Sequence, residues 1–394
     1  MIKYLLLVLC ILFFLGDSSA QENQKYYFFP YSLQLETLNS SGFLGTLESS
    51  ASDILSGNPA NSGTFSKLSF GLSFQATKPF QYPFAISDET KVSRKSDIIP
   101  QSFGIVYPLN EKWSFAAGFN QVYSGLYETS IPVVTIEQPE GTGERITASN
   151  ETRLFKYSVS AAYKFNNLLF ETDKLTVSGQ IDLFHLKETD LIWHTKASYQ
   201  KLVPTLSVGI NYQLNDNWQF GLFVTPKVKI EGSFKIEHGE LLIRHDLDSS
   251  NIGNNSEIPV NFYGPFPYQY DYPAFLSGGL SYNSKTFWKI KYEIAKRFWN
   301  TIDANQTDDL IISGTFIFNL SDNFSFSTGY YASDHSVDLK YFGSAQYTRS
   351  YLLFGLKYKI DNFTFDAAVA DNQSLEDKSR ITTTIYKLSL NYEL

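Results

Sequence analysis

The sequence predicts an all-β fold, a transmembrane antiparallel β-barrel of about 14 strands whose lumen is plugged by an N-terminal hatch. Three observations lead to this prediction. Apolar and polar residues alternate with a period of two from about residue 64 to the C-terminus. The alternating runs are roughly ten residues long, which suits a transmembrane strand, whereas strands of soluble proteins average about 5–6 residues. The connections between the runs are alternately short and long, as at the two rims of an outer-membrane barrel.

The composition narrows the class of protein further. The chain has 394 residues, a formal net charge of −8 and 16% aromatic residues, and its 18% of charged residues is below the ~25% of ordinary globular proteins. Because the chain is acidic and has no basic run, nucleic acid is not expected as a partner. No apolar stretch of about 18 residues follows the N-terminus, so a helical membrane protein is excluded.

Residues 1–20 have the pattern of a secretory signal peptide. Lys3 precedes the apolar run 4–15, and the small residues 18–20 provide a cleavage site. The run is too short to span a membrane. Cys10, the only cysteine, lies inside the run, so the mature chain needs neither disulfides nor thiolate metal sites.

The alternation makes residues 64–394 the barrel domain. In 204–214, for example, leucine, valine, isoleucine and tyrosine alternate with polar residues and glycine. The predicted strands are 64–76, 99–108, 112–124, 152–165, 174–186, 201–214, 217–230, 272–283, 286–297, 308–320, 323–332, 349–360, 363–371 and 380–394.

A repeat accompanies the short turns. Gly-x-x-Tyr occurs at 104–107, 209–212, 279–282 and 355–358, each near the end of a strand that enters such a turn, and aromatic residues soon follow the turn. Ordinary hairpin chemistry is one interpretation. We favour an aromatic girdle at the inner membrane interface, because the aromatic residues share the parity of the outward apolar residues.

The C-terminus also has the pattern of a closing barrel strand. Leu394, Tyr392 and Leu390 alternate with polar residues, and a closed barrel must pair its last strand with its first. Such endings resemble the signal read by the barrel assembly machinery. We therefore expect that machinery as a partner during biogenesis, outer-membrane lipids and lipopolysaccharide around the wall, and a location in the bacterial outer membrane.

Residues 21–63 precede the first strand and do not alternate. This segment is too small to form a stable core of its own. It contains Asn58, Pro59 and Ala60 shortly before the first strand. It is either a tail or a hatch folded inside the barrel, since a lumen of about fourteen strands is wide enough to hold one.

These motifs give the sequence a resemblance to the outer-membrane long-chain fatty acid and aromatic hydrocarbon transporter family (FadL/TodX). Members carry a hatch of similar length that ends in Asn-Pro-Ala just before the first strand, here Asn58-Pro59-Ala60. The Gly-x-x-Tyr repeat and the strand-opening Pro204 and Pro273 are also similar. In architecture the resemblance covers essentially the whole mature chain. It implies passage of hydrophobic small molecules and a lateral exit at a kink in the third strand, where Gly118 is the only interior glycine and would permit the kink.

No pattern of an enzyme occurs in the sequence. Gly71–Gln75 lacks the final glycine of a nucleophile elbow and lies in a predicted strand. His238 and His245 lie among acidic residues in one loop, but no calcium-loop spacing occurs, and a solvated acidic loop is the better interpretation. We therefore predict neither catalytic activity nor a metal or cofactor.

Two features are candidates for ligand binding. The predicted loop 231–271 carries aromatic residues, which are costly to expose unless they pack or bind something. They form either a cap on the barrel mouth or a groove for an apolar ligand; the predicted ligand-binding residues are Phe262, Phe266, Tyr268 and Tyr270. The second feature is a set of inward charges that would anchor the hatch or attract a carboxylate: Lys156, Asp182, Lys227, Lys229, Lys289, Lys291, Glu293, Lys357, Lys359 and Asp366.

The predicted function is uptake of hydrophobic small molecules, long-chain fatty acids or aromatic hydrocarbons, by capture in the extracellular loops and hatch-gated passage. Two other functions remain open. Some relatives in the resembling family serve protein secretion, which would make the loops a docking surface. A general diffusion porin is the other, with residues 21–63 as a tail and an open lumen.

Overall fold

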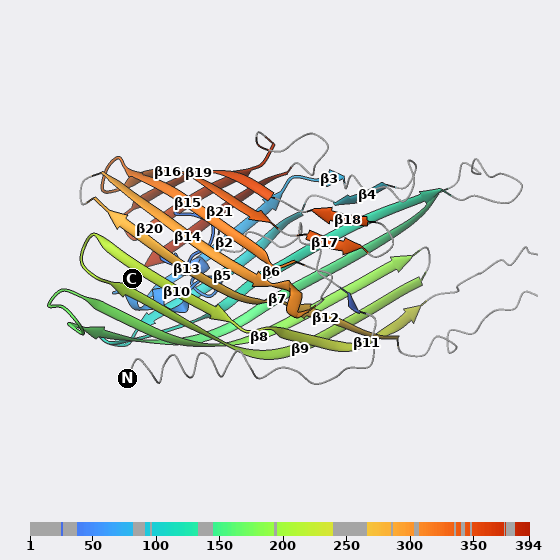
Figure 1. The fold of residues 1–394 in the computed structure, drawn as a ribbon, viewed down its shortest axis with the longest axis horizontal. Helices are drawn as coiled ribbons and strands as arrows, with labels where there is room; N and C mark the ends of the chain where they lie inside the picture. The colour runs from blue at the N-terminus through green and yellow to red at the C-terminus, as the bar shows by residue number, and fades with distance from the viewer. Residues whose placement is uncertain are drawn as a thin grey trace, which may run out of the picture.

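The alternating runs of the sequence form a closed antiparallel β-barrel in the computed structural model, with short turns at one rim and long connections at the other (Figure 1). The signal peptide predicted at 1–20 lies outside the described residues. The described residues are 25–26, 38–81, 91–94, 97–132, 145–192, 195–238, 266–284, 287–302, 307–334, 336–339, 343–346, 349–373, 375 and 383–394.

Fourteen strands of the described residues form the wall, as predicted. The wall closes where β2 pairs with β21, from Ser69 opposite Glu393 to Thr77 opposite Ile385. The strands are β2 (Ser69–Thr77), β5 (Asp97–Pro108), β6 (Trp113–Pro132), β7 (Arg145–Asn166), β8 (Lys174–Ile192), β9 (Thr195–Gln213), β10 (Trp218–Thr225), β13 (Ala274–Asn283), β14 (Trp288–Phe298), β15 (Asp309–Asn319), β16 (Phe324–Asp334), β19 (Arg349–Ile360), β20 (Phe363–Asp371) and β21 (Thr384–Glu393).

Shorter elements extend the wall on the side of the long connections. β11 (Val228–His238) and β12 (Phe266–Tyr272) continue β10 and β13, and β1 (Lys25–Tyr26) adds to β12 in parallel. The others are β3 (Phe80–Gln81), β4 (Lys91–Arg94), β17 (Ser336–Leu339), β18 (Gly343–Gln346) and the 3-10 helices η2 (Ala51–Asp53), η3 (Pro59–Thr64) and η5 (Trp299–Thr301).

The wall is apolar outside and polar inside. On β8, Ile181 is 56% exposed, whereas its neighbour Asp182 is fully buried. On β14, Ile294 is 53% exposed and Glu293 only 3%. Exposed apolar side chains on an outer face, with buried polar side chains in the lumen, are the arrangement of a barrel surrounded by lipid. Within the described residues, no helix is long and apolar enough to cross a membrane.

Asparagine side chains shape the short turns. The Oδ1 atom of Asn110 accepts hydrogen bonds from the backbone N–H groups of Lys112 and Trp113. The Oδ1 atom of Asn215 does the same for Asn217 and Trp218. The rings that follow the turns pack across strands near this rim, as in Trp113–Tyr163, Trp218–Tyr282 and Trp288–Phe316. The repeated turn motif therefore fixes the loop conformation and sets aromatic rings near one rim.

The largest departure from the predicted strands is their length on the other rim. The strands β6, β7, β8 and β9 have 20, 22, 19 and 19 residues and run well into segments predicted as loops. Likewise, part of the predicted loop 231–271 is strand, because β11 extends to His238 and β12 begins at Phe266. Polar alternation in a strand that has left the membrane resembles loop composition, which is why the sequence under-predicted these ends.

Residues 38–64, here called the internal segment, lie inside the barrel. Among the described residues this segment contacts all fourteen wall strands. Most of its side chains are buried, including Leu38, Phe43, Leu47 and Ile54. Residues 38–63 of the segment predicted as the hatch therefore lie in the lumen on the side of the short turns (Figure 1).

Candidate functional site

The Asn58-Pro59-Ala60 motif holds the internal segment to the wall. Asn58 caps η3, and its Oδ1 atom accepts a hydrogen bond from the N–H of Ala60 at 3.0 Å. Pro59 occupies the first helical position, where no N–H is required. The Nδ2 atom of Asn58 donates to the carbonyl oxygens of Thr46 at 2.9 Å and Ile210 at 2.8 Å. One buried side chain thus caps the helix, closes the internal segment on itself and attaches it to β9.

The glycines of the Gly-x-x-Tyr repeat lie where the internal segment approaches the wall. The tyrosines of the repeat face the other way, and Tyr107 and Tyr358 are 49% and 48% exposed. The two interpretations of the repeat, hairpin turns and an aromatic girdle, explain the tyrosines but not the glycines. A Cβ at any of the four glycines would meet the internal segment: Ala51 at Gly104, Asn58 at Gly209, Leu47 at Gly279 and Ser40 at Gly355.

Two sets of ion pairs add to this attachment, one fully buried and one partly exposed. Lys387 Nζ on β21 donates to Asp53 Oδ1 at 2.6 Å, and both side chains are 1% exposed. Glu48 pairs with Lys289 and lies 3.9 Å from Lys291, both on β14. Burial raises the pKa of the Glu48 carboxyl, but the two lysines outweigh burial and bring the pKa to about 2. The carboxylate is therefore ionised at physiological pH.

The predicted inward charges divide into several groups. Lys289, Lys291, Glu293 and Asp366 contact the internal segment; the N–H of Thr46 donates to Glu293 at 2.8 Å. The sequence did not identify Lys387, because it lies in the last strand among residues taken as an assembly signal. The remaining predicted residues have other surroundings. Asp182 accepts hydrogen bonds from the wall residues Ser158 and Ser207, Lys156 is buried, and Lys357 lines a cavity of about 460 Å³ at the short-turn side. Three lysines form ion pairs with wall residues: Lys227 with Asp271, Lys229 with Glu231 and Lys359 with Glu393.

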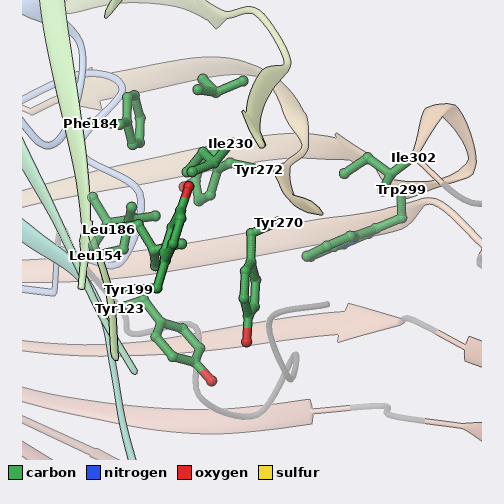
Figure 2. Close-up of a cluster of buried hydrophobic side chains, with 12 residues drawn as sticks. Tyr123, Leu154, Phe184, Leu186, Tyr199, Ile230, Tyr270, Tyr272, Trp299 and Ile302 are labelled. Atoms are coloured by element: carbon green, nitrogen blue, oxygen red, sulfur yellow. The ribbon is translucent and has the colours of Figure 1, made fainter. Parts of the chain in front are cut away.

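A cluster of buried apolar side chains, here called the apolar chamber, lies on the other side of the internal segment. Its aromatic and aliphatic side chains come from β6, β7, β8, β9, β11, β12 and the β14–β15 connection and point toward one another (Figure 2). Rings of Phe184 and Tyr272 lie 5.3 Å apart. The members of the chamber are Val122, Tyr123, Leu154, Phe184, Leu186, Tyr199, Val228, Ile230, Tyr270, Tyr272, Trp299 and Ile302, with Val203 packed against them.

Only one of the four predicted ligand-binding aromatics is placed in this chamber by the structure. Tyr270 is 6% exposed, and its hydroxyl donates to Glu188 Oε1 at 2.7 Å. Phe266 and Tyr268 lie on β12, a strand and not a loop, but their side chains lie outside what the structure describes. Phe262 lies outside the described residues altogether. The predicted aromatic segment thus includes part of β12, but the wall residues that complete the chamber were not predicted. Alternation along a strand tells which side chains face the lumen and does not tell how far along the barrel axis they lie.

Among the residues that the structure describes, the wall ladder is interrupted on one side of the chamber, between β5 and β6. Their ladder ends at Ser102 opposite Asn120, and β4 resumes it at Arg94 opposite Tyr127. A register shift lies between Gln121 and Tyr123 of β6. The side chain of Gln101 crosses the gap and donates to the carbonyl of Gln121 at 3.1 Å. We call this gap the first breach.

Gly118, the predicted kink, lies beside the first breach but not in it. It pairs regularly with Gly104 on β5 and Ser158 on β7. A Cβ at Gly118 would overlap the carbonyl of Phe103, so this glycine permits close approach of two strands. The irregularity of β6 begins three residues later.

A second interruption lies on the other side of the chamber. β9 pairs with β10 up to Val208 opposite Val224 and with β11 from Ser198 opposite Lys235. In the part of the chain that the structure describes, no ladder pair joins residues 199–207 to 225–234. We call this gap the second breach. The four long strands β6 to β9 therefore form a continuous panel with a breach at each edge.

A buried charge cluster also lies in the lumen. Arg297 donates to Asp309 at 3.0 Å, and Arg349 lies 3.7 Å from the same carboxylate. These three side chains come from β14, β15 and β19 and are at most 8% exposed. Two guanidinium groups beside one carboxylate make this part of the lumen cationic. Among the described residues no group of three metal-ligating side chains occurs, and His245 lies outside them.

No protein-family model and no curated protein matches the chain, whereas solved structures do. The toluene transporter TbuX of Ralstonia pickettii matches with a TM-score of 0.61 at 13% identity, over 91% of this chain and 99% of that one. The toluene transporter TodX of P. putida matches at 0.59 and 13% identity, over 92% and 99%. A FadL homologue of Pseudomonas aeruginosa matches at 0.59 and 11% identity, over 89% and 95%. The resemblance noted in the sequence is thus confirmed for the fold.

Proposed function

We propose that the chain is an outer-membrane channel for the uptake of hydrophobic small molecules, of the class of long-chain fatty acids or aromatic hydrocarbons. The observation that carries the proposal is the apolar chamber, a cluster of buried apolar side chains inside the barrel that is bordered by breaches in the wall. An apolar molecule gains free energy on leaving water for such a chamber, by about 25 cal/mol per Å² of buried apolar surface. The toluene transporters that share the fold support the same function by analogy.

The internal segment decides how a solute leaves the chamber. It contacts every wall strand among the described residues, and buried ion pairs such as Asp53–Lys387 hold it in place. A straight path to the short-turn rim would have to break these pairs, and removing one partner of a buried pair costs about 3–5 kcal/mol. A path through a breach breaks none of them. We assign the exit to the first breach, beside Gly118, where a solute would pass sideways into lipid.

This arrangement counts against a general diffusion porin. A porin needs a water-filled path along the barrel axis, but here that path contains the buried apolar residues Leu38, Phe43 and Leu47. Strong steady conductance of the wild-type protein in planar bilayers would favour the porin. Co-purification of exported proteins, with normal uptake of small molecules in chamber variants, would favour a role in secretion.

The test compares two isoleucines that are both fully buried and inward-facing. Ile230 lies in the chamber, and Ile311 lies in a separate apolar cluster with Phe43 and Tyr331. Ile230→Ala removes three methylene-sized groups from the chamber, so ligand affinity should fall by about 2 kcal/mol, roughly 30-fold. Ile311→Ala should leave affinity within about twofold.

The measurement is displacement of a fluorescent fatty acid from purified protein, followed by uptake of oleate and of toluene by cells. Immunoblots of outer membranes give the surface levels for correction. If Ile230→Ala binds and transports both solutes as well as Ile311→Ala does, at equal surface levels, the chamber is not the binding site and the proposal is wrong.

A further inference from the structure

The second breach lies within the apolar belt and beside the chamber. On its β9 edge, the outward side chains of Leu202 and Leu206 are 50% and 57% exposed, which places this part of β9 at the level of lipid chains. On the inner side, Tyr199 and Val203 belong to the chamber or pack against it. The breach is therefore a short connection between the chamber and the outside of the barrel.

Prolines border the breach on both edges. Pro204 lies on β9 opposite Leu183 of β8 and has no N–H to leave unsatisfied beside the breach. Pro226 follows the last residue of β10. Proline has no backbone N–H to leave unsatisfied in lipid. The cost of an open strand edge at this depth is thereby reduced.

On the far side of the breach, the buried face of the wall changes parity where β10 continues into β11. In β10 the buried residues are Phe223 and Thr225, whereas in β11 they are Val228 and Ile230, so the buried face changes from odd to even numbers. The next strand changes at Pro273, between β12 and β13, and the pairing of the two strands keeps one register across the change. β11 and β12 thus form a two-stranded ribbon whose pleat is shifted by one residue relative to β10 and β13, at two prolines.

Side-chain hydrogen bonds cross the breach, and the one at its β10 end joins Ser207 Oγ to Thr225 Oγ1 at 3.2 Å. The hydroxyl of Tyr199 donates to the carbonyl of Glu231 across the gap at 3.1 Å. The Tyr199 ring lies against Gly232, where a Cβ would overlap the ring. The first breach is bridged in the same way by Gln101. A rotating side chain can open and close such a gap without breaking the wall ladder.

A cavity with a partly basic lining lies at the end of the breach nearer the long connections. Its volume is about 550 Å³, enough for a fatty acid head group and several methylenes. Lys187 and Lys201 line it and are exposed. Glu188 also lines it but is engaged by Tyr270 and by Asn150 Nδ2 at 3.0 Å. Two lysines against one glutamate leave the lining with a net positive charge, which suits an anionic head group.

We infer that the second breach is a second lateral port, gated by Tyr199, through which long-chain carboxylates leave the chamber for the surrounding lipid, while uncharged solutes use the first breach. The carboxylate lies at Lys187 and Lys201, and the acyl chain passes out of the chamber between β9 and β11. An uncharged aromatic hydrocarbon makes no use of the lysines. The inference rests on the proposed function, since the port leads out of the chamber.

The first test asks whether lipid reaches the chamber through the breach. Single cysteines replace Val203 at the breach or Leu154 in the middle of the panel, where β7 is paired on both sides. Each is labelled with bimane in a mature chain that has no other cysteine. In vesicles of phosphatidylcholine with brominated acyl chains, quenching at 203 should be at least twofold that at 154, and Tyr199→Ala should increase it further only at 203. Equal quenching at both positions, unchanged by Tyr199→Ala, would overturn the port.

The second test measures passage. Cysteines at Tyr199 and Gly232 are joined by a short bifunctional thiol reagent, which holds the breach closed. Oleate uptake should fall at least threefold and recover when a cleavable reagent is reduced, whereas toluene uptake should stay within about 30% of the uncrosslinked variant. Lys187→Gln with Lys201→Gln should have the same selectivity, raising the half-saturating oleate concentration about tenfold. Glu171→Gln, in an exposed turn, is the control.

The outcomes separate this inference from the proposed function. If Ile230→Ala impairs uptake but neither the crosslink nor the lysine variants do, the chamber is used and the second breach is not a port. If Ile230→Ala has no effect while the crosslink does, the channel function assigned to the chamber fails. Equal loss of oleate and toluene uptake on crosslinking would contradict the assignment to carboxylates.

Discussion

Lys387 on the last strand of the barrel and Asp53 on the internal segment form a fully buried ion pair, with Nζ and Oδ1 2.6 Å apart. The pair joins the start of the mature fold to its end, 334 residues away. Asp53 Oδ1 also lies 3.3 Å from Ser102 Oγ on β5, and its Oδ2 atom accepts from Asn39 and Ser50. One carboxylate thus links the internal segment to the wall and to itself.

Asp53→Asn should loosen the internal segment, because it leaves Lys387 charged, buried and without its carboxylate. The expected cost is about 3–5 kcal/mol, seen as frequent opening events in planar bilayers. Asp53→Asn with Lys387→Met should restore the closed state, since a buried pair can be replaced by neutral residues at little cost. Glu393→Gln, which removes the exposed partner of Lys359 at 3.7 Å, should change nothing measurable. Equal conductance of all three variants would contradict the anchoring role of Asp53.

The attachment of Glu48 should respond to acid only at low pH. Its pKa is about 2 in the folded protein against a model-peptide value of 4.5, so the carboxylate stabilises the fold fully above pH 4.5 and loses its effect as the pH falls toward 2. Conductance of the wild-type channel should stay low down to about pH 4 and rise between pH 4 and 2. Glu48→Gln should conduct at pH 7 with no further rise over that interval. A wild-type transition centred near pH 6 would assign the gate to another group.

Two neighbouring glycines test the contact between wall and internal segment. A Cβ at Gly209 would overlap Asn58 Oδ1, whereas one at Gly179 of β8 has no atom within 4 Å. Gly209→Ala should displace Asn58 and produce opening events, and Gly179→Ala should be silent. Both variants should insert equally, which heat-modifiable migration in gels would check. A silent Gly209→Ala would mean that the internal segment can shift away without cost.

Tyr270 should contribute to ligand binding mainly through its ring. Tyr270→Phe retains the ring, and Glu188 keeps its hydrogen bond from Asn150. Tyr270→Ala should weaken fatty acid binding by on the order of 1–3 kcal/mol, roughly 5- to 150-fold, whereas Tyr270→Phe should stay within about threefold. Titration calorimetry with a soluble fatty acid would measure both. If Phe is as damaging as Ala, the hydroxyl and not the apolar surface is what matters.

Removing most of the hatch should convert the channel into a pore. Deletion of residues 24–60 takes away Asn39, Glu48, Asp53 and Asn58 together, while the wall keeps its own ladder between β2 and β21. The deleted protein should still insert and should conduct ions steadily. Unchanged conductance would show that the lumen is closed by something else.

The wall was predictable because its signal is local and repeated. The strands β19 and β20 have the predicted bounds of 349–360 and 363–371, since a period of two and a tight turn at Asp361, where φ is +50°, leave no other register. The interior was less predictable. Lys387 and Asp53 are far apart in sequence, and no local pattern indicates that they meet. The two breaches are irregularities of pairing between strands, which the alternation along each strand does not reveal.

Among the site residues, the sequence identified those that lie in a motif and missed those that depend on height in the barrel. Asn58 was found because it starts a three-residue motif. Trp299 and Phe184 were missed, although both are at most 1% exposed in the chamber. Trp299 lies in a connection beside polar residues, and Phe184 has the same parity as Asp182 two residues earlier. Alternation alone predicts that the side chains of Asp182 and Phe184 both face the lumen. It does not tell that the lumen is polar around Asp182 and apolar around Phe184.

The internal segment has a consequence for the order of biogenesis. The backbone N–H of Ser52 donates to Asn391 Oδ1 at 3.0 Å, so the internal segment is held by a strand that is synthesised much later, 339 residues further along the chain. Contacts so distant along the chain form slowly, because a long loop must close before they are gained. Until β21 arrives, β2 has no closing partner and Asp53 has no lysine. The pairing of β2 with β21, which closes the barrel, and the attachment of the internal segment to β21 are therefore completed together. A nascent chain that ends before residue 384 can form neither.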